Sequence, residues 1–312
     1  MTIDYVGEGA SLRITETANA RLWVLLVDTT DLFHCCTNLG DQAGRGSSTD
    51  KVSQIDLDDP MTAPAEAAAV AVTDPAVASV TLAVARQALR RQETDLHALT
   101  GAPGMYRLND PELLSLDARN SIVIRRSALI TALFAGLATE VGATGVDLSV
   151  TNIYQAMFQL QLNRNPQEPG GPCCVLHPQQ FNDFQESLRG EAGAVQFQAA
   201  TDRMLYFGAP GFYGEWHGIS FWTSDQVPTV NAGADRGGAM FTHGCFGYKE
   251  ASAAQFLRRD AGSAFLPVPE FSPAFIELVR TPASALFDAV FNYYAGVVEI
   301  EDLRGVEIIT DA

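Results

Sequence analysis

The sequence predicts an α+β protein that carries a long extended arm. Three observations support this class: an alternating run at residues 79–86, a long helical pattern that starts at Asn109, and mixed strand and helix signals after Val150. Alternation with a period of two indicates a strand, and a breaker-free run behind a capping residue indicates a helix. Strands and helices that interleave along one chain predict the α+β class.

The N-terminal 40 residues are predicted to form an arm. Residues 18–33 can hold a helix with a rough apolar stripe, although residues 23–27 can equally extend as a strand. The first four residues have neither a basic start nor an apolar run, so no secretory signal is predicted. We therefore expect the chain to be cytoplasmic when it is made.

Residues 46–89 predict a β-hairpin that has no core of its own. In the run at residues 79–86, one side is formed by Val80, Leu82, Val84 and Arg86. The other run, at residues 49–57, places on one face Lys51, Ser53, Ile55 and Leu57. The segment between the runs is too long for a tight turn and poor in large apolar residues. Because an isolated two-stranded hairpin is marginally stable in water, we expect another copy of the chain to supply its packing surface.

A long helix is predicted after a short helix at residues 93–99. It starts at Asn109-Asp110-Pro111-Glu112, where a capping residue precedes proline, and it runs to Val141, about 30 residues or roughly 45 Å. Its first half carries charged residues that include Arg119, Arg125 and Arg126. Since residues 127–139 are almost wholly apolar, one end of this helix is predicted to be exposed and the other buried.

The remaining elements alternate between helices and strands. Helices are predicted at residues 150–163, after His177, and at 282–295. Strands are predicted at residues 173–176, 216–223, 239–249, 275–280 and 305–310. The predicted inner helix faces are Ile153, Met157 and Leu160, with Tyr154 as a further candidate, and Phe181, Phe184 and Leu188. The glycine clusters at residues 208–214 and 233–238 lack a phosphate-binding pattern and are interpreted as turns.

The charge of the chain excludes a protein that binds nucleic acid tightly. The chain has 312 residues and a formal charge of −17, and its only lysines are Lys51 and Lys249. Binding to phosphates requires a basic stripe, which the scattered arginines do not form. The apolar run at residues 127–139 is also too short to span a bilayer.

The five cysteines are predicted to be reduced and buried. Two kinds of site are considered for Cys173, Cys174 and His177. One is a catalytic thiol with a histidine base, and the other is a zinc site completed by residues 34–36. Zinc sites usually have Cys-x₂₋₄-Cys spacing, which neither adjacent pair has. A catalytic thiol needs an electropositive setting, whereas these cysteines precede an apolar strand. We therefore predict no catalytic site, no metal and no cofactor, and we keep a hydrolase that uses Cys174 and His177 as a rival.

Four segments, taken in order, resemble a known family. They are Cys174–Gln180, with its strand and His-Pro-Gln entry, residues 216–224 followed by Val227-Pro228, residues 237–241, and residues 304–311. Together with the hairpin and the long helix, they resemble the major capsid proteins of tailed bacteriophages, which have the HK97-like fold.

The resemblance implies a set of domains over nearly the whole chain. They are an N-terminal arm (1–45), an extended loop (46–92), a peripheral domain with a spine helix (93–144 and 274–282), and an axial domain (145–273 and 283–312). Spine-helix residues are Pro111, Arg119, Arg125 and Arg126, and turns at the capsomer axis are Gly211, Gly214, Gly233 and Gly237.

The resemblance also implies function and partners. We expect pentamers and hexamers in an icosahedral virion shell, assembled in the host cytoplasm, that encloses double-stranded DNA without binding it specifically. Because no long scaffolding segment fits before residue 40, we expect a separate scaffolding protein, with a portal and a decoration protein as further partners. Some relatives form a Lys–Asn isopeptide bond from the loop, where Lys51 is the only lysine; the alternative is a solvated or ion-paired lysine. An encapsulin-like compartment is the second rival.

Overall fold

The computed structural model describes residues 30–55, 74, 76–94, 111–163, 171–190, 198–199, 211–252, 264–268, 271, 274–281 and 286–311. The chain separates into two compact units. The first contains Met1–Asp28, Arg86–Val123 and Ser252–Tyr294, and the second contains Thr29–Ala85, Ile124–Ala251 and Ala295–Ala312. Three elements, β4, α2 and β15, cross from one unit into the other. The domain boundaries that the resemblance implies remain predictions.

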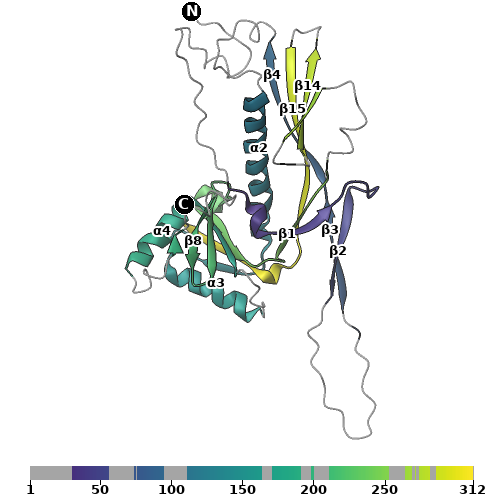
Figure 1. The fold of residues 1–312 in the computed structure, drawn as a ribbon. Helices are drawn as coiled ribbons and strands as arrows, with labels where there is room; N and C mark the ends of the chain where they lie inside the picture. Colours follow the sequence, from purple (N-terminus) through teal and green to yellow (C-terminus); the bar gives the residue numbers. More distant parts are fainter. Residues whose placement is uncertain are drawn as a thin grey trace, which may run out of the picture. The chain divides into compact units, whose positions relative to one another are not determined.

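The second unit is built on a mixed sheet of eight strands (Figure 1). At its centre, β11 pairs antiparallel with both β16 and β6, and β6 pairs parallel with β9. The order is β5-β16-β11-β6-β9-β8-β7, with β10 on β11. The strands are β5 (Glu140–Gly142), β6 (Cys173–Leu176), β7 (Gln198–Ala199), β8 (Phe212–Trp216), β9 (Ile219–Thr223), β10 (Thr229–Val230), β11 (Asp235–Phe241) and β16 (Gly305–Asp311).

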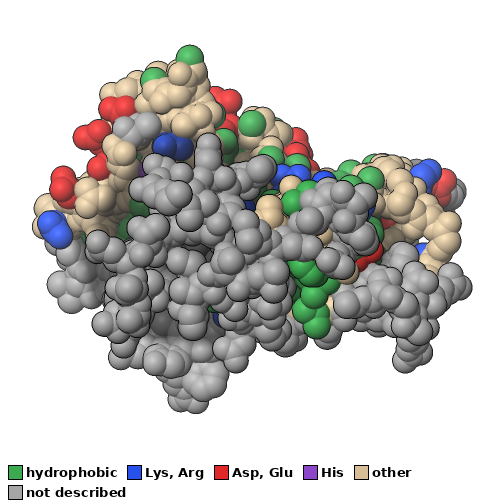
Figure 2. Space-filling view, turned by 90° about the horizontal axis from the view of Figure 1, so that it is seen from above, with side chains coloured by type: hydrophobic (Ala, Val, Ile, Leu, Met, Phe, Trp, Pro, Cys, Tyr) green, Lys and Arg blue, Asp and Glu red, His purple; other side chains and the backbone are tan. Residues whose placement is uncertain are grey.

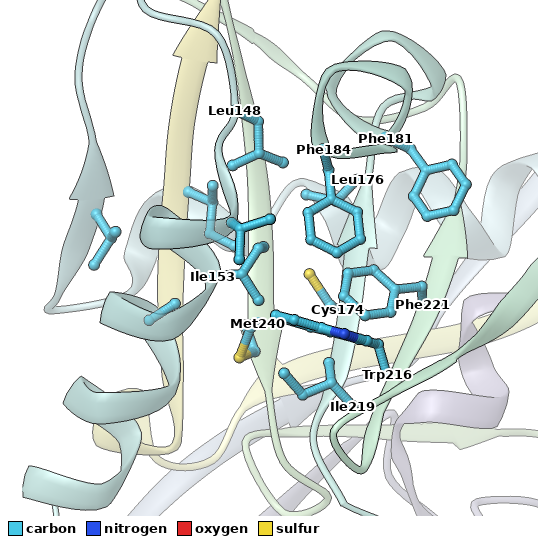
Figure 3. Packing of buried hydrophobic residues seen from close by; sticks show 14 of the residues in the cluster. Leu148, Ile153, Cys174, Leu176, Phe181, Phe184, Trp216, Ile219, Phe221 and Met240 are labelled. Atoms are coloured by element: carbon cyan, nitrogen blue, oxygen red, sulfur yellow. The ribbon is translucent and has the colours of Figure 1, made fainter. Parts of the chain in front are cut away.

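Two helices cover one face of this sheet and form the first core. Helix α3 (Val150–Leu162) starts at a capping box made by Ser149 and Asn152, and α4 (Pro178–Arg189) starts at His177. Side chains of both helices meet alternate strand residues in a cluster of aromatic and aliphatic groups (Figure 3). Phe184 stacks on Phe221 with ring centroids 4.9 Å apart and meets Trp216 edge-on.

The opposite face of the sheet carries the second core. The short helices η2 (Leu32–Cys35) and η3 (Phe134–Gly136) contribute to it, together with the last turns of α2 (Pro111–Thr131). Phe134 contacts both Phe241 and Phe246, at centroid distances of 5.9 and 6.0 Å. The N-terminal segment and the end of α2 thus bury the face that α3 and α4 leave open.

Further strands complete the second unit. Strand β1 (Thr37–Asp41) pairs parallel with β12 (Phe246–Glu250), and β12 pairs antiparallel with the last residues of β15 (Leu286–Glu299). Two more strands, β2 (Thr49–Ile55) and β3 (Val77–Ala83), form a separate two-stranded sheet (Figure 1).

The described residues of the first unit form strands and the first part of α2. Strand β15 pairs antiparallel with β14 (Ala274–Thr281), which pairs with β13 (Ala264–Pro267), and β4 (Ala85–Thr94) also pairs with β15. The buried carboxylate of Asp288 accepts two hydrogen bonds from Arg90, at 2.8 and 3.0 Å, and one from Gln92. These bonds satisfy an acid that β15 would otherwise bury without a partner.

The structure confirms several predicted elements and corrects others. The helices at 150–163 and after His177 and the strands at 173–176, 275–280 and 305–310 are present. The helix predicted at 282–295 is wrong, because residues 286–299 form β15. Its aromatic and β-branched residues pack as a strand, which outweighs the helix-start signal at Pro282. Residues 282–285 lie outside the described part.

Turns divide two of the predicted strands. Residues 216–223 form β8 and β9, separated by a turn in which His217 and Gly218 have φ of 51° and 76°. Residues 239–249 belong to β11 and β12, separated by a turn that contains Gly244 at φ 91°. Glycine and histidine supply positive φ here at low cost, which the apolar pattern alone did not reveal.

The long helix is shorter than predicted. Helix α2 ends at Thr131 rather than near Val141, and the chain continues through η3 so that Phe134 reaches the second core. Glu93, predicted to begin a short helix, lies in β4, and residues 95–99 lie outside the described residues. In the N-terminal arm, Leu32 and Phe33 belong to η2, and residues 18–29 are likewise not described.

Candidate assembly surface

The β2–β3 hairpin has two faces that differ sharply in exposure. Its register runs from Thr49 opposite Ala83 to Ile55 opposite Val77. We call the inner hairpin face the side formed by Asp50, Val52, Gln54, Ala78, Val80 and Leu82. We call the outer hairpin face the side formed by Thr49, Lys51, Ser53, Ile55, Val77, Ser79, Thr81 and Ala83. Leu82 on the inner face is completely buried, whereas every residue of the outer face is exposed.

The inner hairpin face belongs to the second unit's own packing. Asp50 forms an ion pair with Lys249, a lysine that is only 1% exposed. Gln54 donates from Nε2 to the carbonyl oxygen of Ile300, and the amide of Val84 donates to Ser48 at 2.8 Å. The hydrogen bond from Lys249 lowers the pKa of Asp50. The base of the hairpin is therefore fixed by groups of its own chain.

The outer hairpin face is exposed along the described hairpin, and at its base the Thr49 hydroxyl lies 3.1 Å from the Ser47 hydroxyl. Ile55 and Val77 are a cross-strand apolar pair with exposed fractions of 58% and 69%. A two-stranded sheet gains little stability by itself, and an exposed apolar cross-strand pair makes this face a candidate contact surface.

The residues predicted to make contacts from the extended loop lie on different faces and in different elements. Lys51 and Ile55 lie on the outer hairpin face, and Val80 and Leu82 lie on the inner one. Val84 lies between β3 and β4. Arg86 lies in β4 and donates to Asn292 at 2.7 Å, so it serves the first unit, and Leu57 lies outside the described residues.

Strand β12 joins three segments of the second unit through consecutive side chains. Tyr248 stacks on Phe33 of the N-terminal segment with centroids 4.2 Å apart. Lys249 holds the hairpin through Asp50, and Glu250 pairs with Arg126 of α2. We call this arrangement the β12 junction. It gives the arm a defined root without any large core of its own.

The most buried arginine of the described residues lies at this junction. The Arg126 guanidinium donates to Asp31 at 2.6 Å and also pairs with Glu250. It lies 4.8 Å above the Phe33 ring, and its side chain is 10% exposed. Sequence reasoning placed Arg126 on the exposed half of the helix, which is wrong, because its partner Asp31 lies 95 residues earlier. Arg119 and Arg125 are exposed, and Pro111 is the first residue of α2.

Two of the four glycines predicted in axis turns lie in turns. Gly211, at φ 86°, precedes β8, where an added Cβ would lie 2.1 Å from Thr30 Oγ1. Gly233, at φ 94°, ends the single 3-10 turn η5 (Asn231–Gly233) that follows β10. The prediction of turns at Gly214 and Gly237 is wrong, because they lie in β8 and β11. At Gly237 a Cβ would lie 2.7 Å from the Glu307 carboxylate, so this glycine makes room for a buried acid.

Glu307 is an acid with an unusual environment. It lies on β16 opposite Glu140 of β5 and is 3% exposed. Burial, and secondarily the charge of Glu140, raise the pKa of Glu307 to about 7. The carboxyl therefore keeps its proton in the folded chain through a range of pH in which an unfolded glutamate has lost it.

The Glu307→Gln variant is expected to reveal this proton. Between about pH 4.5 and 7 the unfolded chain binds fewer protons than the folded chain, so wild-type stability falls as pH rises through this window. The amide has no charge to bury. We expect the variant to be more stable than wild type by about 1–2 kcal/mol at pH 8 and nearly equal to it at pH 4.5. Urea unfolding at both pH values measures this. Glu215→Gln, at an exposed site, is the control, and its stability should differ from that of wild type by the same amount at pH 4.5 and at pH 8. A gain in the stability of Glu307→Gln that does not change with pH would contradict the assignment.

The cysteines do not form a reactive site. Cys174 lies among Phe184, Trp216 and Phe221 in the first core, and burial raises the pKa of its thiol (Figure 3). The Nδ1 atom of His177 accepts the amide of Gln179 at 3.3 Å as the cap of α4, so this ring serves the helix start. All five cysteines are free and buried. Among the described residues, no group of three His, Cys, Asp or Glu side chains could hold a metal ion.

The described surface shows how charge is distributed. On the face seen in Figure 2, Lys and Arg side chains lie in separate small spots among acidic ones, with no continuous basic stripe. In the part of the chain that the structure describes, no helix is both long and apolar enough to cross a membrane.

Comparisons identify similar structures but no similar sequence family. No family model matches the chain, and no curated protein matches it. A structure from Mycobacterium phage Che8 is similar with a TM-score of 0.64 at 11% identity, covering 95% of this chain and 96% of that chain. The capsid structure of cyanophage P-SCSP1u gives a TM-score of 0.59 at 13% identity, covering 98% and 95%. The holo-SrpI encapsulin complex of Synechococcus elongatus gives 0.58 at 14% identity, covering 94% and 92%.

Proposed function

Because the chain has the HK97-like fold of phage capsid structures, we propose that it is a major capsid protein whose copies close into an icosahedral shell. The observation that carries the proposal is the outer hairpin face, which is exposed along its whole length and includes the apolar pair Ile55 and Val77. The fold supplies the architecture of a shell subunit, and this face supplies a surface that needs a neighbour.

The shell depends on repetition of modest contacts. Closed symmetric assemblies use one set of contacts many times, so each contact can be weak while the total is large. The Lys249–Asp50 ion pair and the other bonds of the β12 junction fix the base of the hairpin. We propose that the outer hairpin face then lies on a neighbouring subunit within pentamers and hexamers. The turns at Gly211 and Gly233 are proposed to face the capsomer axis.

The interior of the shell is proposed to enclose double-stranded DNA without holding it. A net charge of −17 repels a polyanion, and packed DNA must slide past the wall. The same proposal includes a virion location, assembly in the host cytoplasm, a separate scaffolding protein, a portal and a decoration protein.

Negative-stain microscopy tests the proposal directly. The full chain is produced alone and together with a candidate scaffolding protein from the same genome, and the expected result is closed shells of uniform diameter. A soluble monomer that stays monomeric at high concentration in both preparations would contradict the proposal.

An encapsulin-like compartment is the second candidate. The similarity to the SrpI encapsulin complex favours it, since that shell has the same fold and comparable coverage of this chain. The two candidates differ in content: a compartment encloses cargo enzymes, whereas a capsid shell encloses DNA. Nuclease-protected DNA in purified particles would support the capsid, and a co-purifying enzyme would support the compartment. The hydrolase alternative has no support, because Cys174 is buried in the core and His177 caps a helix.

A further inference from the structure

Helix α3 is apolar on two sides. Its inner side buries Ile153, Ala156 and Leu160 in the first core. Its outer side presents Tyr154, Phe158 and Leu162, spaced four residues apart, with exposed fractions of 46%, 56% and 56%. A surface helix that packs on one core normally has a polar outer side. Tyr154 also packs on Trp216 and His217, with ring centroids 5.1 and 5.9 Å apart. Among the described residues, the packing of the second unit does not account for the exposure of Phe158 and Leu162.

Neighbouring loops extend this stripe into a patch. The Tyr154 hydroxyl lies 3.3 Å from Nε2 of His217, at the turn between β8 and β9. At the other end of the helix, Asn163 Nδ2 donates to the carbonyl oxygen of Leu303 at 3.0 Å, and the Leu303 side chain is 45% exposed. We call the α3 patch the set Tyr154, Phe158, Leu162, His217 and Leu303.

Charge indicates which partner fits the α3 patch. Residues 149–163 contain no charged side chain, in a chain that carries a net charge of −17. A basic partner would be recognised by acidic residues on the helix, and α3 has none. Beside Leu303, Glu301 is paired with Arg304 at 2.7 Å, which leaves Asp302 as the acid at the edge of the patch. Two copies of this chain repel each other through their net charge, and this repulsion is weakest where the facing surfaces are uncharged. Aromatic residues without charge at the centre are also typical of the core of subunit interfaces.

We propose that the α3 patch is a second contact between copies of this chain, separate from the outer hairpin face. The proposal rests on the proposed self-assembly and adds a named surface to it. The outer hairpin face and the α3 patch belong to different elements of the second unit, so each copy has two surfaces through which it can engage other copies. An assembly built in this way can lose one contact while it keeps the other.

The test is Phe158→Glu in the full chain, under the conditions in which wild type forms shells. Glutamate is a good helix former, and Phe158 is more than half exposed, so the melting temperature by circular dichroism should stay unchanged. Loss of one buried aromatic contact and introduction of a like charge should raise the subunit concentration needed for assembly by about tenfold or more. Val146→Glu is the control, because Val146 is an apolar residue of the same unit, 52% exposed and outside the α3 patch.

The outcomes separate this inference from the proposed function. A Phe158→Glu chain that assembles at wild-type concentration overturns the α3 patch and leaves the capsid proposal intact. An equal defect in Val146→Glu also overturns it, because the effect would then not be specific to the patch. A photo-crosslinking residue at position 158 should give covalent dimers whose mapped peptides both come from this chain, and capture of a different protein overturns the proposal. If wild type itself never assembles, the proposed function fails and the patch fails with it.

Discussion

Replacing Arg126 by methionine is expected to lower the free energy of unfolding by about 3–5 kcal/mol, the usual loss when one partner of a buried ion pair is removed. The guanidinium is 10% exposed and joins Asp31 to Glu250, so its removal leaves two acids without their shared cation. It also removes the cation–π contact with Phe33. Urea unfolding of unassembled subunits at neutral pH measures the change.

Two further variants make this result interpretable. Arg125→Met changes the exposed neighbour on the same helix and should alter stability by about 0.5 kcal/mol or less. The triple variant Arg126→Met, Asp31→Asn, Glu250→Gln has no uncompensated charge at this position and should regain part of the loss. A single variant that loses less than about 1 kcal/mol would show that the β12 junction does not depend on this ion pair.

Charging the outer hairpin face is expected to abolish shell formation while leaving the subunit folded. In the double variant Ile55→Asp, Val77→Asp, two carboxylates replace the exposed apolar cross-strand pair. Burying these charges against a neighbour that also carries net negative charge costs several kcal/mol at each contact, and each 1.4 kcal/mol is about a tenfold loss of affinity. Sedimentation and negative-stain microscopy should show free subunits in place of shells.

The matched control for the hairpin is Val146→Asp. Val146 is 52% exposed in the same unit and lies outside both proposed contacts, so this variant adds one carboxylate where the hairpin variant adds two. This variant should assemble normally. If the hairpin double variant still forms shells at wild-type concentration, the outer hairpin face is not a subunit contact, even though the fold is unchanged.

Local signals were sufficient for elements whose sequence pattern and packing agree. The apolar face of the helix at 150–163, the His177-Pro178 start of α4 and the buried run of β6 predicted those elements with nearly correct bounds. The hairpin followed from alternation alone, and the sequence also suggested that its stability requires a neighbour. What alternation could not decide is which face is inner, because that depends on Lys249 and Ile300, roughly 200 or more residues away.

Non-local pairing accounts for the errors. The segment at 286–299 has an apolar pattern that suits a helix or a strand, and only its pairing with β12 and β14 selects the strand. In the same way, the buried position of Arg126 depends on Asp31 and Glu250, which no local pattern connects to it. The interpretation of Tyr154 as a candidate for the inner side of α3 is wrong, because Tyr154 is 46% exposed and lies in one stripe with Phe158 and Leu162. The signal that could have shown this stripe is the spacing of four residues along an uncharged helix.

The burial of all five native thiols has a practical consequence. A cysteine introduced at Ser53 or Thr81 on the outer hairpin face would be accessible, whereas the five native thiols are buried. A maleimide dye should therefore label the added cysteine selectively, without removal of the native ones. Its modification rate in free subunits and in finished particles would then report directly whether this position becomes covered.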